Sequence, residues 1–347
     1  MSLRLLTCGS VLVLMMSAGP GFPIRAGNQT QPVPPTVAEG YPLLSDAAFS
    51  RIFDQISNWG RWGKEDVKGT YNLLTPEKRK QAVALVRSGI SVSLEHTLIE
   101  TEGPDVRNPI QKLNRGNKII WNSVHGGTYH SHIDALCHYA YKDVLYNGFA
   151  RAEVETEQGC MPMGIDMYKD GFITRGVLID IPWLKGVAWL EPGTPVTLRD
   201  IEAWEQKTGI TVLPGDAVFL RTGKWAKRAT DGPWLIDRPG STAIEWGPDA
   251  GWHWSVLPWL KDHDVAIVAA DGPNDVRPAF VEPSIARFLP IHTGVLAGMG
   301  AIILDGQDLE DVAKVAVELN RWEFMMTAAP LRIAGGGGSP INVIATF

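Results

Sequence analysis

The chain has 347 residues, of which 45% are hydrophobic and 20% are charged, and its formal net charge is −6. This balance is typical of a soluble globular protein, and the length suffices for one large domain or two ordinary ones. The charge is only mildly acidic and no run of Lys and Arg stands out, so nucleic acid is excluded as an expected partner.

Residues 1–44 differ in composition from the rest of the chain. One early arginine precedes an apolar run from Leu5 to Ala18, and small residues and prolines follow. This layout predicts a secretory signal peptide over residues 1–26, with an uncleaved membrane anchor as the alternative. The mature protein is then expected to be secreted or periplasmic and to have no membrane segment. The Pro-rich residues 27–44 predict an extended arm or linker.

Periodic segments follow in chain order. Residues 75–89 predict a helix that begins after Thr75, and residues 90–98 alternate as a strand. Two further helices are expected at residues 197–209 and 308–322, with Thr197 and Asp308 as N-caps. Three short apolar runs bounded by Gly or Asp predict buried strands at residues 175–181, 215–223 and 264–272. No repeat or composition break follows residue 45, so residues 45–347 predict a single α/β domain.

Three residues carry structural expectations of their own. Cys137 and Cys160 remain after the predicted cleavage, and the sequence allows a disulfide between them without requiring it. Arg221 ends an apolar strand, where an unpaired charge would be costly to bury. We therefore expect a carboxylate such as Asp180 or Asp271 to hold it; the alternative is that Arg221 binds a substrate carboxylate.

Four of the eight histidines lie in one short segment, HGGTYHSHIDALCH, which runs from His125 to His138. Side chains two residues apart point to the same side of an extended segment, so His130, His132 and Asp134 are expected to share one face. Two imidazoles and a carboxylate suit Zn²⁺, Mn²⁺ or Fe²⁺ and leave positions for water. His138 would be a further ligand or a base, and the glycines after His125 would let its imidazole turn back to the site. The alternative is that some of these are ordinary surface or core histidines.

The segment resembles the H-x-G-T-H-x-D-x-x-x-H motif of the metal-dependent cyclase-like hydrolases, which include bacterial kynurenine formamidases and isatin hydrolases. The resemblance extends over Trp59 to Phe347, including NWGRWG and IHTGVLAGMGAIILDGQDLEDVA. It implies an α/β fold of the swivelling β/β/α type, in which a β-barrel-like mixed sheet forms the core and helices pack outside. It also implies a homodimer or homotetramer.

The resemblance assigns site residues to positions of this chain. His132 and Asp134 match two of the family's metal ligands. His138 matches the last histidine of the motif, which is a second-metal ligand in some relatives and the catalytic base in others. His292 matches a later histidine that faces the same site, and Asp305 lies where relatives carry Glu or Gln.

The first histidine of the motif has no direct counterpart. Counting back without a gap reaches Thr128, which is a poor ligand. Three inserted residues would align His125 with the motif, and His130 offers a second solution. The sequence leaves both open, and we expect at least one of the two to bind the metal.

These residues predict a metal-dependent hydrolase that binds one Mn²⁺ or Zn²⁺ ion, with a second ion as an alternative. The expected reaction is cleavage of a C–N bond in an amide, aryl formamide or cyclic amide, on a small aromatic amide or lactam. A lactone or ester hydrolase, a cyclase or dehydratase on the same site, and a non-catalytic metal- or ligand-binding protein are the alternatives. The predicted metal ligands are His125, His130, His132 and Asp134, and the predicted catalytic residues are His138, His292 and Asp305.

Overall fold

The computed structural model describes residues 41–106, 109–113, 118–120, 130–234, 247–282 and 289–347. The predicted signal peptide, nearly all of the predicted arm and His125 therefore lie outside the described residues. Within the described ranges, no helix is long and apolar enough to cross a membrane.

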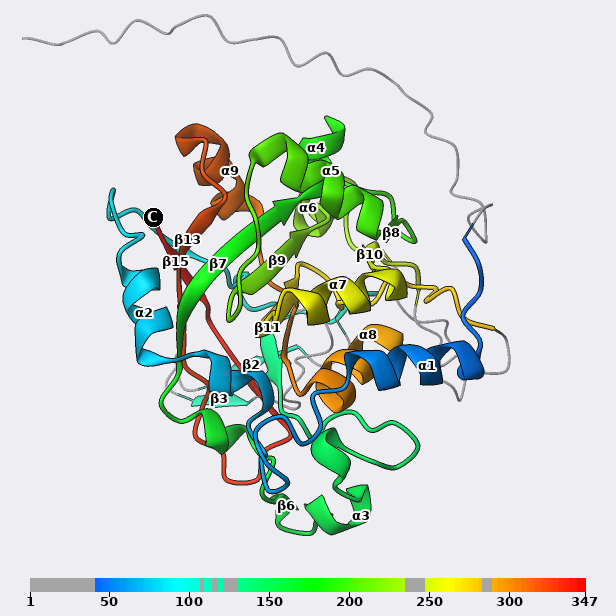
Figure 1. Cartoon of the computed structure of the whole chain (residues 1–347). Coiled ribbons are helices and arrows are strands. Elements are labelled where there is room, and N and C mark those ends of the chain that lie inside the picture. Colours follow the sequence, from blue (N-terminus) through cyan, green and yellow to red (C-terminus); the bar gives the residue numbers. More distant parts are fainter. Residues whose placement is uncertain (1–40, 107–108, 114–117, 121–129, 235–246, 283–288) are drawn as a thin grey trace, which may run out of the picture. The chain divides into compact units, whose positions relative to one another are not determined.

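One mixed sheet of nine strands forms the core, in the order β1-β15-β13-β7-β9-β11-β12-β4-β14. Its central strands β7, β9, β11 and β12 run parallel, and the other pairs are antiparallel. The sheet curls into half a barrel (Figure 1), which confirms the expected barrel-like mixed sheet. The strands are β1 (Ser91–Ser93), β4 (His132–Asp134), β7 (Phe172–Asp180), β9 (Ala217–Arg221), β11 (Ile267–Ala270), β12 (Ile302–Asp305), β13 (Glu323–Ala328), β14 (Gly338–Pro340) and β15 (Ile344–Thr346).

Six short strands form three two-stranded sheets. Two of these sheets are antiparallel and the third, β8 with β10, is parallel. The pairs are β2 (Gln111–Leu113) with β3 (Lys118–Ile120), β5 (Glu155–Thr156) with β6 (Gly159–Cys160), and β8 (Pro195–Val196) with β10 (Gly251–Trp252).

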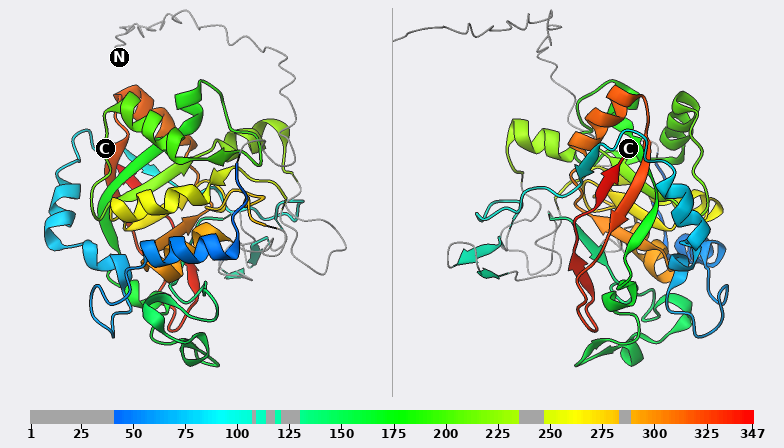
Figure 2. Two further views of the ribbon diagram at one scale, coloured as in Figure 1. Left: turned by 45° about the vertical axis from the view of Figure 1, so that its right-hand side comes forward. Right: turned by 90° about the vertical axis from the view of Figure 1, so that its left-hand side faces the viewer.

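Helices cover the curled sheet. In the right-hand view of Figure 2, α1, α2 and α7 lie on one side of the sheet and the β2–β3 hairpin lies on the other. α1 packs against α7 and η7, and α2 packs against β7 and β13. The α-helices are α1 (Asp46–Ile56), α2 (Pro76–Val83), α3 (Arg151–Val154), α4 (Ile181–Lys185), α5 (Leu198–Thr208), α6 (Lys224–Asp231), α7 (Leu257–Asp262), α8 (Pro290–His292) and α9 (Glu310–Leu319). The short 3₁₀ helices are η1 (Gly69–Leu73), η3 (Tyr146–Gly148), η4 (Ile165–Tyr168) and η5 (Trp254–Val256), and η7 (Thr293–Met299) is a π-helix.

The helix starts follow the predicted caps in two cases out of three. The Thr75 side chain accepts a hydrogen bond from the backbone N of Lys78 at the start of α2. Thr197 forms a capping box with Asp200 at the start of α5. At α9 the prediction is wrong by one residue, because Leu309 occupies the N-cap position.

The predicted buried strands 175–181, 215–223 and 264–272 correspond to β7, β9 and β11. All residues of β9 and β11 are buried, as expected of parallel strands that are covered on both faces. The predicted strand 90–98 is shorter than expected. Its observed part, β1, lies at the sheet edge and pairs with the three residues of β15 alone.

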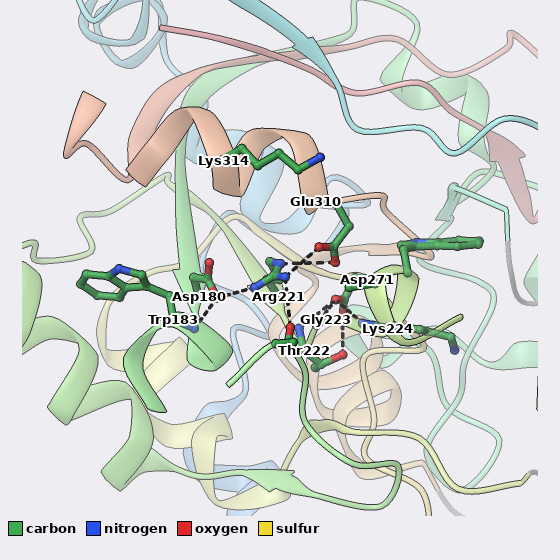
Figure 3. Close-up of polar contacts among 12 residues, drawn as sticks. Asp180, Trp183, Arg221, Thr222, Gly223, Lys224, Asp271, Glu310 and Lys314 are labelled. Carbon is green, nitrogen blue, oxygen red and sulfur yellow. Dashed lines mark hydrogen bonds and ion pairs between the residues drawn. The ribbon is translucent and has the colours of Figure 1, made fainter. Parts of the chain in front are cut away.

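Arg221 is held by carboxylates, as the sequence predicts (Figure 3). Its Nη1 donates to Asp180 Oδ1 at 2.9 Å, and its Nη2 donates to Glu310 Oε2 at 2.7 Å. Asp271, the other expected partner, instead accepts hydrogen bonds from the backbone N atoms of the three residues that follow Arg221. Arg221 thus joins the ends of β7, β9 and α9.

A disulfide links Cys137 to Cys160, with a Cα–Cα distance of 6.2 Å. It ties the segment that follows β4 to strand β6. The sequence allowed this disulfide without requiring it, and the structure contains it. The disulfide holds the chain next to His138.

Candidate metal centre

Two neighbouring strands bring the central side chains of the site together. β4 and β12 are antiparallel, and their register sets Asp305 directly opposite His132. Directly opposite side chains lie on the same face of a sheet, and Asp134 shares that face because it lies two residues beyond His132. One imidazole and two carboxylates therefore converge on one point.

His132, Asp134 and Asp305 form a compact buried group, which we call the metal group. One ligand atom from each residue lies within 4.8 Å of the other two. His132 Nε2 lies 3.9 Å from Asp134 Oδ1 and 3.7 Å from Asp305 Oδ2. These spacings allow one ion to contact all three side chains.

The backbone sets the tautomer of His132. Its Nδ1 lies 2.8 Å from the carbonyl oxygen of His130 and donates a hydrogen bond to it. The ring therefore presents Nε2, with its lone pair, to the metal group. A backbone carbonyl behind the ring is a common way to orient a metal-binding histidine.

His138 and His292 flank the metal group. His138 Nε2 lies 3.8 Å from Asp134 Oδ2. His292, at the end of α8, places Nε2 at 3.7 Å from Asp134 Oδ2 and at 3.1 Å from Asp305 Oδ2. The structure thus brings five of the seven predicted site residues together, and it places His292 within hydrogen-bonding distance of Asp305.

The electrostatics of the group reflect two carboxylates in a buried place. Burial raises the pKa of Asp134 to about 6. Burial alone would raise the pKa of Asp305 as well, but His292 brings it below its ordinary value. The pKa of His292 lies well above its ordinary value because neighbouring carboxylates outweigh the effect of burial. Burial lowers the pKa of His138 to about 4, so its imidazole is neutral at pH 7.

This donor set fits a divalent cation. Two carboxylates packed this closely in a buried site repel each other, and a cation between them would offset that repulsion. Imidazole nitrogen and carboxylate oxygen are ligands of Zn²⁺ and Mn²⁺. His132, Asp134 and Asp305 would hold the ion, with His138 and His292 beside it.

His130 is not part of the metal group. Its Nε2 accepts a hydrogen bond from the backbone N of Ile99 at 3.3 Å. The expected shared face holds for His132 and Asp134 but not for His130, because the chain bends at His130 and β4 begins only at His132. Metal binding by His130 or His125 stays a prediction.

The sequence analysis missed two residues that contact this site, Asn274 and Asp275. Asn274 donates two hydrogen bonds to Asp305 Oδ1, and Asp275 accepts one from His292 Nδ1. The only sequence signal for them is their place, a few residues beyond the end of a predicted buried strand. Polar residues at the end of a buried strand often face a functional site.

Comparisons with known proteins agree with this fold. A sequence model of the cyclase family, described as "Putative cyclase", matches residues 54–274. A crystal structure of "a novel cyclase" has a TM-score of 0.70 and 29% identity, and the match covers 85% of this chain and 99% of that chain. No curated protein matches the chain.

Two isatin hydrolase structures match more weakly. Isatin hydrolase A from Labrenzia aggregata, bound to benzyl benzoate, has a TM-score of 0.49 and 22% identity, covering 76% of this chain and 94% of that chain. An isatin hydrolase bound to the product analogue thioisatinate has a TM-score of 0.48 and 22% identity, covering 79% and 97%. The family model, by contrast, spans more than half of this chain, and it includes β4 and the Asn274 segment. The chain therefore belongs to the cyclase family.

Proposed function

We propose that this protein is a metal-dependent hydrolase that cleaves a C–N bond in an amide, an aryl formamide or a cyclic amide. The observation that carries the proposal is the metal group itself. One imidazole and two carboxylates lie within 4.8 Å of one another in a buried position, and a neutral imidazole lies beside them. Two buried carboxylates this close together are costly unless cations offset their charge, and a divalent ion would do so together with the neighbouring His292.

A divalent ion in the metal group would activate a water molecule and polarise the carbonyl oxygen of the substrate. The chain's own residues would manage the protons. His138, whose Nε2 lies 3.8 Å from Asp134 Oδ2, is close enough to the metal group that it would accept a proton from the attacking water and pass it to the leaving nitrogen. His292, with Nδ1 bonded to a carboxylate, would keep Nε2 directed at the same point.

Mn²⁺ or Zn²⁺ is the proposed metal, because both accept mixed imidazole and carboxylate ligands. A small aromatic amide or lactam is the proposed substrate, on the strength of the sequence resemblance. A secreted or periplasmic location is also proposed. The disulfide between Cys137 and Cys160 supports it, since disulfides persist in oxidising compartments. The homodimeric or homotetrameric assembly stays a prediction that light scattering would check.

The first experiment is elemental mass spectrometry on the purified full-length protein and on Asp134→Ala, His125→Ala and His130→Ala. We expect close to one Mn or Zn per wild-type chain and its loss in Asp134→Ala. Loss of the metal in either His125→Ala or His130→Ala would identify that histidine as the ligand that replaces the first histidine of the motif. A folded wild-type protein that takes up neither metal would reject the hydrolase mechanism.

Turnover on a panel of aryl formamides, lactams and lactones would then define the bond that is cleaved. We expect metal-dependent hydrolysis of formamides or lactams, and a decrease of about 10²- to 10⁴-fold in kcat/KM in His138→Ala with metal content retained. Turnover of lactones alone would favour ester chemistry on the same site. A protein that binds metal but turns over no member of the panel would be better described as a binding protein.

A further inference from the structure

Asn274 and Asp275 are consecutive buried residues that contact two different parts of the metal centre. They follow β11 in the sequence DGPNDV, and they are 0% and 1% exposed. Neither belongs to the metal group. Each instead contacts one side chain that points into the centre: Asn274 contacts Asp305 and Asp275 contacts His292.

Asn274 occupies one oxygen of Asp305. Its backbone N donates to Asp305 Oδ1 at 2.9 Å, and its Nδ2 donates to the same oxygen at 2.6 Å. Asp305 Oδ2 is then the oxygen that faces His292 Nε2, at 3.1 Å. Two donors on one oxygen hold the carboxylate in a single orientation and leave the other oxygen directed at the metal position.

Trp252 fixes the orientation of the Asn274 side chain. The indole Nε1 donates to Asn274 Oδ1 at 3.1 Å, and the backbone N of Trp252 donates to the Asn274 carbonyl oxygen at 2.8 Å. An indole N–H can only donate, so the atom that it contacts must be the amide oxygen. The amide nitrogen of Asn274 must therefore face Asp305.

Asp275 fixes the orientation of the His292 ring. Its Oδ1 accepts a hydrogen bond from the backbone N of Ile291 at 2.8 Å. Its Oδ2 accepts from the His292 backbone N at 3.1 Å and lies 2.6 Å from the His292 Nδ1. A carboxylate acceptor keeps the proton on Nδ1, and the ring then directs Nε2 at the metal group.

We propose that Asn274 and Asp275 are positioning residues of the metal centre, which set the rotamer of Asp305 and the ring orientation of His292 before an ion binds. This inference rests on the proposed function, because it assumes that the metal group holds an ion. Neither residue touches that position, so each acts through the side chain that it orients. Their removal should weaken metal binding by more than their contribution to folding explains.

The test measures the Kd for Mn²⁺ of the metal-stripped full-length protein, by electron paramagnetic resonance of the free ion. The variants are Asn274→Ala, which keeps the backbone donor, and Asp275→Asn, which keeps the shape but turns one acceptor oxygen into a donor. Trp252→Phe removes the hydrogen bond to the Asn274 amide oxygen and keeps the one from Asn274 Nδ2 to the Leu304 carbonyl oxygen at 3.0 Å. The Tm of each metal-free variant is recorded alongside the Kd.

Two matched controls separate positioning from folding. Asn58 is 2% exposed and its Nδ2 donates to a backbone carbonyl at 2.9 Å, so Asn58→Ala is the control for Asn274→Ala. Asp271 is 0% exposed and accepts backbone N–H groups, so Asp271→Asn is the control for Asp275→Asn. Neither control residue contacts the metal group.

We expect Asn274→Ala and Asp275→Asn to raise the Kd for Mn²⁺ by about 10- to 100-fold, and Trp252→Phe to raise it by less. The controls should lower the Tm of the metal-free protein and leave the Kd within about threefold of wild type. Wild-type Kd values in all folded variants at the two positions and at Trp252 would overturn the inference alone. A wild-type protein that binds no Mn²⁺ or Zn²⁺ would overturn the proposed function together with it.

Discussion

Arg221 is a buried charge that two carboxylates compensate. Its side chain is 11% exposed, and it contacts Asp180, which is 2% exposed, and Glu310, which is 18% exposed. Removing one member of a buried ion pair leaves its partner uncompensated. We expect Arg221→Met to lower the free energy of unfolding by about 3–5 kcal/mol, measured by urea denaturation.

The control for Arg221 is a surface ion pair on α9, the helix to which its partner Glu310 belongs. Lys314 and Asp311 are 70% and 75% exposed, so solvent screens their attraction. Lys314→Met should change the free energy of unfolding by less than about 0.5 kcal/mol. Equal losses in the two variants would show that Arg221 is not paired as described.

His253 allows a pH dependence to be assigned to one residue. Its ring packs against those of Tyr41, Trp254 and Phe280, and burial lowers its pKa to about 4. In the unfolded chain a histidine has a pKa of about 6.5. Between pH 6.5 and pH 4 the unfolded state therefore binds more protons, and stability falls as the pH falls through this window.

We expect the wild type to lose about 2 kcal/mol of unfolding free energy relative to His253→Phe between pH 7.5 and pH 4.5. Phenylalanine suits the aromatic surroundings and has no proton to bind. Urea denaturation in the presence of a chelator removes the contribution of any metal. Parallel pH profiles for the two proteins would contradict the assignment.

At the scale of elements, the disulfide joins the segment that follows β4 to strand β6 across 23 residues of sequence. A cross-link of this span restricts the unfolded chain and stabilises the folded state by about 3 kcal/mol. The double variant Cys137→Ser with Cys160→Ser should lose about that much, measured by urea denaturation. Reducing agent should destabilise the wild type to a similar extent and leave the double variant unchanged.

The strands show which residues of the site a local sequence pattern can place. Alternation within one strand is enough to place His132 and Asp134 on one face. Asp305 joins them only because β12 lies beside β4 in one particular register, and these strands are far apart in sequence. No local periodicity fixes such a register, so its place in the site is expected from family resemblance alone.

His130 and Asn274 mark the limits of sequence analysis in this chain. The alternation rule fails at His130 because it lies before the strand begins, at a bend that no residue type signals. Asn274 lies beyond its strand and has no partner nearby in sequence; its role depends on contacts with Trp252 and Asp305. By contrast, α2, α5, α9 and the strands β7, β9 and β11 follow from caps and apolar runs, which are local properties.

At the scale of the whole molecule, metal binding and folding are coupled. An ion that binds only the folded state stabilises it by about 2.7 kcal/mol at a free concentration 100 times its Kd. For a chain of this size that corresponds to a rise in Tm of about 4 °C. We expect Mn²⁺ or Zn²⁺ to raise the Tm of metal-stripped wild-type protein by this amount, and a chelator to reverse the effect.

Asp134→Asn should change which protein is the more stable, depending on whether metal is present. The substitution keeps the shape of the side chain and removes one of two buried negative charges. Without metal the variant should have a higher Tm than the wild type at pH 8, since Asp134 and Asp305 no longer repel each other. With Mn²⁺ the order should reverse, because the variant has lost a charged ligand and gains little from the ion. Scanning calorimetry of both proteins with metal and with chelator measures all four values. A wild type with the higher Tm both with metal and with chelator would contradict this expectation. Asp134 would then stabilise the folded protein without metal, and its charge would not be a cost that metal binding offsets.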